Sequence, residues 1–158
     1  MGLFRFDSGQ PDLELDYFEP SEFGDWSRRM DRGLLLKLDD FRKRWGAPVH
    51  ISPVMGALGR DEYSSSMHSV PRLGRVCAAD VFPHSMEARL FPTAYTLAKQ
   101  AGFGGIGIYT DTQFQGRDWP MMHLDVRAVS RGDTPASWAR VNGEYMGLDV
   151  LMPEGWTK

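Results

Sequence analysis

The sequence predicts an α+β protein with a small, mainly antiparallel sheet and flanking helices. One segment carries apolar residues at helical spacing, and a second has the residues that cap a helix. Four short apolar runs between polar stretches have the length of strands. Their order along the chain is helix, strand, long loop, strand, helix, strand, strand, which indicates the α+β class.

Length and composition indicate one globular domain. The chain has 158 residues, of which 42 % are hydrophobic and 25 % are charged, which is close to globular averages and argues against a disordered chain. A domain of this length buries about 70 % of the surface of its unfolded chain, which is enough for a hydrophobic core. We expect a single domain over 1–158, made of an N-terminal arm (1–25), a core (26–140) and a C-terminal tail (141–158).

Charge and cysteine content exclude several classes of protein. Eighteen Lys and Arg against 21 Asp and Glu give a net charge of -3, which argues against a nucleic-acid partner bound by bulk positive charge. The single cysteine, Cys77, excludes an internal disulfide and a multi-cysteine metal cluster. No window approaches 18 apolar residues, and segment 1–6 lacks a secretory signal. We therefore expect no membrane partner, no export signal and a monomer by default.

The first half of the chain contains one clear helix. Leu13, Leu15 and Tyr17 recur with period two, which predicts a short edge strand in a loosely packed arm, with Phe18 also packing. A helical face follows and ends before a glycine and a proline. That face consists of Leu34, Leu38, Phe41 and Trp45. Segment 49–52 is then a predicted strand, and 55–75 is a long loop, which is often functional in a compact domain.

The second half contains three predicted strands and one helix. Segment 75–82 is a predicted central strand, and segments 104–109 and 121–127 are two more, joined by a polar loop over 110–119. The helix either spans 85–100, with Ser85 as its cap, or begins at Pro92.

Asp80 is an acid within an apolar run, Val76–Phe82. A carboxylate in a buried strand is costly unless it is paired or bound to a metal. An ion pair with Arg72 or Arg75 is the alternative to a metal site.

Three ionisable residues share one face of the predicted strand 121–127. His123, Asp125 and Arg127 alternate with apolar residues, so their side chains point to the same side. This pattern is typical of a site wall backed by a core, although a solvated strand face has the same pattern. At this distance Asp125 either orients His123 or shares its site.

His68, at the end of the long loop, completes a set of metal-ligand types. Two histidines and one carboxylate, here His68, His123 and Asp80, suit a catalytic zinc ion that keeps a fourth position for water. No fixed-spacing motif such as His-Glu-x-x-His is present. His50 and His84 are competing candidates.

Several short features then follow one another along the chain. They are Ser66-Met-His68, Gly74, Ala78-Ala-Asp80, Gly104-Gly-Ile-Gly-Ile-Tyr109, His123-Leu-Asp125 and, later, Trp138. In this order they resemble the D-Ala-D-Ala carboxypeptidase-type zinc peptidases, a group related to lysostaphin-type enzymes and to the hedgehog amino-terminal domain. The resemblance covers roughly residues 18–140, and hence the peptidase-like core.

The resemblance implies a hedgehog/D-Ala-D-Ala peptidase-like fold and a Zn²⁺ ion bound by His68, Asp80 and His123. It implies a zinc metallopeptidase, either a carboxypeptidase or an endopeptidase, in which a zinc-bound water attacks an amide of a peptidoglycan peptide.

Three departures from the family affect the other site residues. Many members carry a general-base Glu where this chain has Pro120, and we expect Asp125 to replace it, with Asp118 as the alternative. The family's substrate-holding arginine is missing after the first strand, and Arg60 or Arg127 is expected to bind substrate instead, together with Ser66. The interval between His68 and Asp80 is longer than in the family, and a hairpin extension is expected to absorb it.

Three readings of function remain open. The first is a peptidoglycan hydrolase, a phage lysin (endolysin) or virion-associated protein that stays in the cytoplasm until release and acts on the bacterial cell wall. The second is a non-catalytic, metal-binding or structural domain of the same fold. The third is a serine hydrolase that uses Ser64, Ser65 or Ser66, although no Gly-x-Ser-x-Gly elbow is present.

Overall fold

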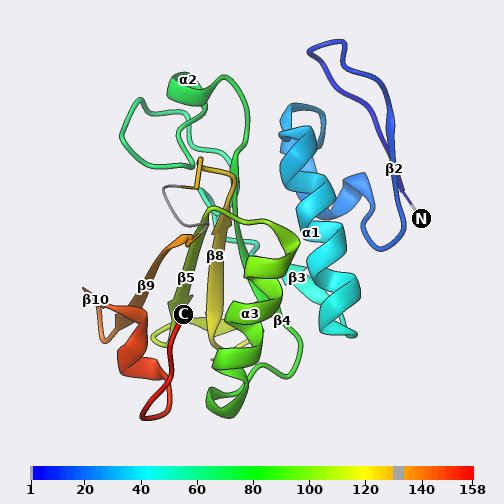
Figure 1. Cartoon of the computed structure of the whole chain (residues 1–158). Coiled ribbons are helices and arrows are strands. Elements are labelled where there is room, and N and C mark those ends of the chain that lie inside the picture. Colours follow the sequence, from blue (N-terminus) through cyan, green and yellow to red (C-terminus); the bar gives the residue numbers. More distant parts are fainter. Residues whose placement is uncertain (1, 130–133) are drawn as a thin grey trace.

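A six-stranded sheet forms the centre of the computed structural model, which describes residues 2–129 and 134–158 (Figure 1). Met1 and 130–133, which belong to the arm and core expected from the sequence, lie outside the described residues. The strand order is β10-β9-β5-β8-β4-β3, and neighbouring strands are antiparallel except for β5 and β9, which are parallel. The strands are β3 (Val49–Ile51), β4 (Ala78–Pro83), β5 (Gly105–Tyr109), β8 (Met121–Asp125), β9 (Ala136–Val141) and β10 (Glu144–Met146). The predicted α+β class with a mainly antiparallel sheet is confirmed.

Two helices, α1 (Arg32–Trp45) and α3 (Phe91–Ala101), cover one face of this sheet (Figure 1). The predicted apolar stripe of α1 is confirmed, because Leu34, Leu38 and Phe41 are buried in the core. The helix ends at Gly46, which adopts φ 76° and donates its N–H to the Arg42 carbonyl. Glycine accepts this left-handed conformation at little cost, so it terminates the helix.

The sequence allowed two starting points for the second helix, Ser85 or Pro92, and the start of α3 shows which is correct. The helix begins at Phe91, with Pro92 in its first turn, after a 3₁₀ turn, η2 (Ala88–Leu90). A start at Ser85 was wrong, since that residue has φ 60° and does not cap the helix. Proline fits the first turn because its missing N–H would have no partner inside the helix there.

The N-terminal arm is a hairpin packed on the core. Strands β1 (Gly2–Phe4) and β2 (Leu13–Leu15) pair with each other, so the expected edge strand exists but does not join the main sheet. Leu13 and Leu15 are buried, whereas Tyr17 is 42 % exposed. The prediction of loose packing was wrong. The ring centres of Phe4 and Phe23 are 5.6 Å apart in the core, and Phe23 belongs to the 3₁₀ segment η1 (Pro20–Arg29).

Several short elements were not predicted. The long loop contains α2 (Val70–Leu73), and the polar loop contains the hairpin β6 (Gln113–Phe114) and β7 (Arg117–Asp118). Near the C-terminus, β9 and β10 complete the sheet, and η4 (Leu148–Leu151) buries Leu148 in the core.

The two faces of the sheet differ in chemistry. The face toward α1 and α3 carries buried apolar side chains, among them Val81, Ile106 and Leu124. On the opposite face, register places four residues side by side across four strands. They are Asp80 (β4), His123 (β8), Gly107 (β5) and Trp138 (β9). None of the described helices is long and apolar enough to cross a membrane.

Candidate metal centre

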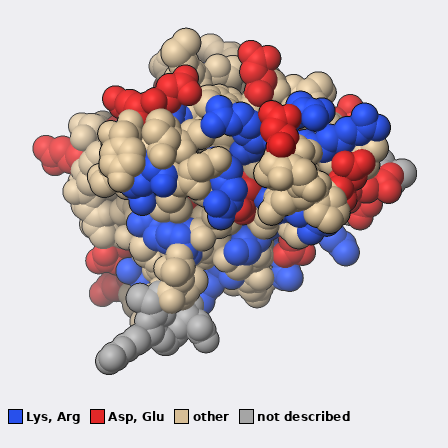
Figure 2. All heavy atoms as spheres, turned by 90° about the horizontal axis from the view of Figure 1, so that it is seen from above, with Lys and Arg blue, Asp and Glu red and all other residues tan. Residues whose placement is uncertain are grey.

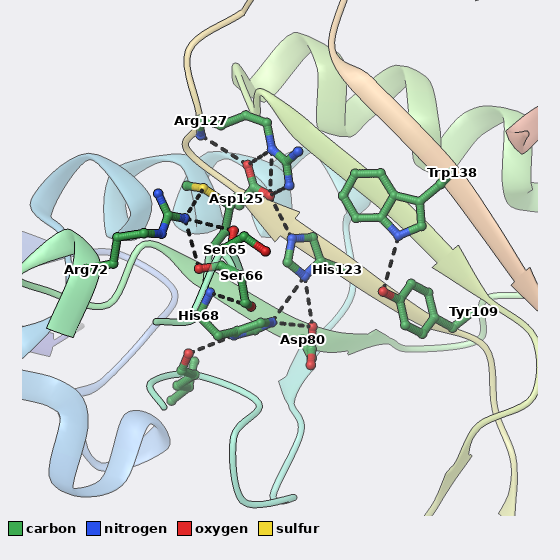
Figure 3. A network of polar contacts seen from close by, with 12 residues as sticks. Ser65, Ser66, His68, Arg72, Asp80, Tyr109, His123, Asp125, Arg127 and Trp138 are labelled. Atoms are coloured by element: carbon green, nitrogen blue, oxygen red, sulfur yellow. Dashed lines mark hydrogen bonds and ion pairs between the residues drawn. The ribbon is translucent and has the colours of Figure 1, made fainter. Parts of the chain in front are cut away.

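Three ligand atoms converge on this second face of the sheet (Figure 3). His68 Nε2 lies 3.2 Å from His123 Nδ1, and Asp80 Oδ1 lies 3.3 Å from each of these nitrogens. Asp80 and His123 are direct cross-strand partners, while His68 comes from the long loop. The structure therefore brings together the three residues expected from the sequence to bind zinc.

The hydrogen bonds on the far side of each imidazole determine where its lone pair lies. His68 Nδ1 is 2.7 Å from the Leu58 carbonyl, which only accepts, so this nitrogen carries the proton. His123 Nε2 is 2.7 Å from the Asp125 carboxylate and donates to it in the same way. With both rings neutral, two nitrogen lone pairs and a carboxylate oxygen face one another. Such a set of acceptors is stable only with a proton or a metal ion between its members.

The dimensions of the set fit zinc. In a tetrahedral site with zinc–ligand distances of roughly 2.0–2.1 Å, neighbouring ligand atoms lie about 3.3 Å apart. The three observed separations are 3.2, 3.3 and 3.3 Å. Two imidazoles and one carboxylate are also ligands that zinc commonly takes in catalytic sites. His68, Asp80 and His123 could therefore hold the ion without rearrangement of the sheet.

The ionisation of the set follows from its burial and its mutual contacts. Burial opposes the charge on Asp80, but hydrogen bonds with His123 and His68 outweigh it and lower its pKa to about 2. Burial also disfavours the charged ring of His123. The hydrogen bonds to Asp125 and Asp80 and the charges of these acids are stronger and raise the pKa of His123. A proton and a metal ion thus compete for the same position.

Asp125 lies behind His123. Its side chain is completely buried, and its pKa is lowered by hydrogen bonds with His123 and Arg127 that outweigh the cost of burial. Arg127 donates its backbone N–H to Oδ1 at 3.0 Å and its guanidinium to Oδ2 at 2.6 Å. A carboxylate so placed orients the histidine and fixes its tautomer. Both contacts leave it facing away from the cavity, so the expected role of Asp125 as general base has no geometric support.

A turn and one arginine hold His68. Ser66 Oγ accepts the backbone N–H of His68 at 3.1 Å, and Arg72 donates to the carbonyls of Ser64, Ser65 and Ser66. Arg72 lies on α2, the helical turn that fills the long interval between His68 and Asp80. The expected hairpin extension was therefore wrong, and the extension instead supplies a side chain that organises the ligand loop.

The cluster opens into a cavity of about 710 Å³. Three arginines line it, Arg60, Arg127 and Arg140, and among the described residues Asp80 is its single acidic lining residue. Seen from above, Lys and Arg gather over the middle of the molecular surface and most acidic side chains lie nearer its edges (Figure 2). Two of the three arginines are paired with acids, Arg127 with Asp125 and Arg140 with Asp111, whereas the described hydrogen bond of Arg60 is to a backbone carbonyl.

The other expected site residues lie in different places. Asp118 is exposed on the β6–β7 hairpin, outside the cavity lining, so the structure does not bring it to the cluster. Ser66 lines the cavity, as do Arg60 and Arg127. Arg127 is engaged with Asp125 and lies 5.1 Å from the centre of the Trp138 ring, whereas Arg60 donates Nε–H to the Gly56 carbonyl.

The structure also tests two alternatives, which are other histidine ligands and an arginine partner for Asp80. The ring centres of His50 and His84 lie 5.8 Å apart, in an aromatic cluster with Trp119. Neither histidine belongs to the ligand set. Arg75 pairs with Asp31 and Arg72 donates to backbone carbonyls, so the alternative of an ion pair between Asp80 and either arginine was wrong.

A serine nucleophile finds no base in the described part of the chain. Ser64 Oγ and Ser66 Oγ accept backbone N–H groups, and no described hydrogen bond joins Ser64, Ser65 or Ser66 to a histidine ring.

Two features of the site were missed by sequence reasoning. The Leu58 carbonyl fixes the tautomer of His68, and Trp138 Nε1 donates to the hydroxyl of Tyr109 at 3.2 Å. The first has no signature in a sequence. The second joins residues 29 positions apart, and only the pairing of β5 with β9 reveals it.

Comparisons with known proteins were made on three levels. A scan against family models, a search of curated proteins and a search of solved structures each found no match. Function is therefore inferred from the residues of the site itself.

Proposed function

We propose that this protein is a zinc-dependent peptidase that hydrolyses amide bonds in the stem peptides of peptidoglycan. The observation that carries the proposal is the convergence of two imidazole lone pairs and one carboxylate oxygen, 3.2–3.3 Å apart, at the wall of an open cavity. The order of the sequence motifs also supports the proposal, because it resembles that of the D-Ala-D-Ala carboxypeptidase-type zinc peptidases, and we propose a hedgehog-like fold on the same ground.

The proposed reaction adds water across an amide bond. The hydroxyl of water joins the carbonyl carbon, the C–N bond breaks, and the nitrogen leaves as an amine after taking up a proton. Zinc, when bound, would lower the pKa of a water toward 7 and polarise the amide carbonyl. In this chain His68, Asp80 and His123 would hold the ion, while Asp125 keeps Nδ1 of His123 free of its proton.

The substrate class follows from the cavity and from the resemblance. Stem peptides of peptidoglycan carry free carboxylates, and a cavity with three arginines in its lining suits them. Arg60 has the least committed guanidinium of the three, since its described hydrogen bond is to a backbone carbonyl. We propose that the protein is a phage lysin or a virion-associated protein that reaches the bacterial cell wall after release.

A second candidate function is supported by one observation. No carboxylate other than that of Asp80 lines the cavity among the described residues, so a separate general base is missing from its wall. A non-catalytic metal-binding domain of the same fold would need the three ligands but no base.

Metal analysis is the first experiment for both candidates. We expect about one zinc per chain in the purified protein and loss of that zinc in His68→Ala, Asp80→Ala and His123→Ala. His84→Ala is the matched control, because this histidine lies outside the ligand set. The same proteins are then incubated with purified peptidoglycan, and the released fragments are identified by mass spectrometry.

The outcomes separate the two candidates. Zinc binding with release of peptide fragments establishes the peptidase. Zinc binding without release, under conditions in which a known hydrolase digests the same material, favours the non-catalytic domain. A folded wild-type protein that takes up no zinc contradicts both.

A further inference from the structure

A tyrosine hydroxyl lies on the same face of the sheet as the metal ligands. Tyr109 ends β5, two positions after Gly107, which pairs with His123. Residues two apart on a strand point to the same side. Tyr109, His123 and Asp80 accordingly line one cavity, and the phenol oxygen of Tyr109 points toward the two ligands (Figure 3).

The hydrogen bond from Trp138 leaves the proton of this phenol available. Trp138 Nε1 lies 3.2 Å from the Tyr109 hydroxyl oxygen. An indole N–H only donates, so the phenol oxygen must accept in this contact and its own O–H is directed elsewhere. The described neighbour of the Tyr109 O–H is the side chain of Tyr145, whose hydrogen bond contributes to the raised pKa of Tyr109. Tyr145 lines the same cavity and is exposed, so an oxygen atom of a bound substrate can replace it as the acceptor of this proton.

Packing on both sides fixes the phenol. A Cβ added at Gly107 would lie 2.6 Å from Trp138 Nε1 and 2.9 Å from a ring carbon of Tyr109. Because Gly107 has no side chain, Trp138 and Tyr109 pack directly on its backbone. The guanidinium of Arg140 lies 4.5 Å from the ring centre of Tyr109 and is held by Asp111 at 3.0 Å. Burial raises the pKa of Tyr109 to about 12, so the hydroxyl keeps its proton at neutral pH.

We infer that Tyr109 donates a hydrogen bond to the amide oxygen of the substrate as negative charge builds up on it. The inference rests on the proposed hydrolysis and assigns a residue to one part of it. The phenol keeps its proton throughout and stabilises the charged state of the oxygen, which is the task of a preorganised donor. Arg127 does not compete for this role, because Asp125 engages its guanidinium.

Two tyrosine-to-phenylalanine variants test the inference. Tyr109→Phe removes the hydroxyl and retains the ring. Tyr95→Phe is the matched control. Tyr95 is also a buried tyrosine, but its hydroxyl lies among the core residues, outside the cavity lining, and has no hydrogen-bond partner within 2–129 and 134–158. For the zinc-loaded Tyr109→Phe protein we expect kcat on peptidoglycan fragments to fall roughly 10²–10³-fold, with KM and zinc content little changed. Tyr95→Phe is expected to retain wild-type values.

A binding measurement separates this inference from the proposed function. A phosphinic analogue of Ala-Ala carries charged tetrahedral oxygens where an amide would have its carbonyl, and its affinity is measured by calorimetry. We expect Tyr109→Phe to weaken its binding at least tenfold. If the wild type does not hydrolyse peptidoglycan but this loss is seen, the peptidase proposal fails and the donor role stands. Unchanged kcat and unchanged analogue affinity in Tyr109→Phe overturn the inference, as does a wild type that neither hydrolyses peptidoglycan nor binds the analogue.

Discussion

At the scale of single residues, the chemistry of the site depends on two contacts behind the ligands. The Leu58 carbonyl and the Asp125 carboxylate each hold the outer N–H of one imidazole. Without these partners either ring could turn its protonated nitrogen toward the centre, and the lone pair needed by a metal would be lost. Asp125 is thus a positioning residue, and Arg127 keeps it ionised.

Replacing Asp125 by asparagine tests this role. We expect Asp125→Asn to lower zinc affinity roughly 10–100-fold, because the amide is a weaker acceptor for His123 and presents an NH₂ group to Arg127. Competition with a zinc chelator measures the affinity. Asp118→Asn serves as control and should bind zinc like the wild type, since Asp118 lies outside the cavity. Equal affinities in the two variants would contradict the assignment.

The phenol of Tyr109 makes a separate prediction about stability at high pH. Burial raises its pKa to about 12 from an ordinary value of 10.0, so between these values the folded state holds a proton that the unfolded state has released. The resulting stabilisation is complete below pH 10 and is lost as the pH rises through 12. Urea unfolding at about pH 9 and about pH 11 should show a loss roughly 1 kcal/mol larger in wild type than in Tyr109→Phe. Identical losses would show that this phenol titrates normally.

At the scale of elements, strand β5 provides space for the site because it lacks side chains at two positions. Gly105 pairs with Asp125, and Gly107 pairs with His123 on one side and Trp138 on the other. A Cβ at Gly105 would collide with the Asp125 carboxylate, and one at Gly107 would collide with Trp138. The glycines of the Gly-Gly-x-Gly-x-Tyr motif thus make room for the residues packed over the strand.

Alanine at position 105 should therefore damage both stability and metal binding. We expect Gly105→Ala to lower the free energy of unfolding by about 1–3 kcal/mol and to weaken zinc binding, because Asp125 must move away from His123. The double variant Gly105→Ala/Asp125→Ala removes the collision. It should lose less stability than the sum of the two single variants, as measured by urea unfolding. Strict additivity would show that the collision is relieved in another way.

Elements with a local signal were predictable, and those that depend on distant pairing were not. The helix over Arg32–Trp45 follows from its apolar spacing and Gly46. Strand alternation placed His123 and Asp125 on one face, but it could not show that Asp125 lies behind the ring and not in the cavity. Strand β9 was missed because Ala136–Val141 has no clear alternation, and its pairing with β5 is parallel and non-local. The roles of Trp138 and Tyr109 were lost with it.

At the scale of the whole molecule, the three ligands join the central sheet to the long loop. Asp80 and His123 belong to neighbouring strands inside the sheet, whereas His68 lies on a loop held by turns, by Arg72 and by backbone hydrogen bonds with Arg60. A metal ion bound to all three would tie this loop to the sheet. Its contribution to stability would follow mass action, about 2.7 kcal/mol at a free zinc concentration of 100 times Kd.

Removal of the metal should therefore increase the mobility of the loop that carries His68 and leave the strands of the sheet unchanged. We expect a chelator to lower the melting temperature and to increase amide hydrogen exchange over 58–69, with β4 and β8 still protected. Exchange followed by mass spectrometry locates the change. His68→Ala, which lacks the loop ligand, should show no further increase in this segment when chelator is added. A uniform increase across the sheet would instead indicate that the metal stabilises the whole fold.

The cross-strand register of the ligands has a consequence for the time course of folding. Asp80 meets His123 only when β8 has paired with β4, and His68 precedes His123 by 55 positions. Contacts between such distant residues require the closure of long loops and form slowly. A chain that is still folding therefore has no complete metal-binding site. The onset of zinc uptake during refolding reports the time at which β8 has paired with β4.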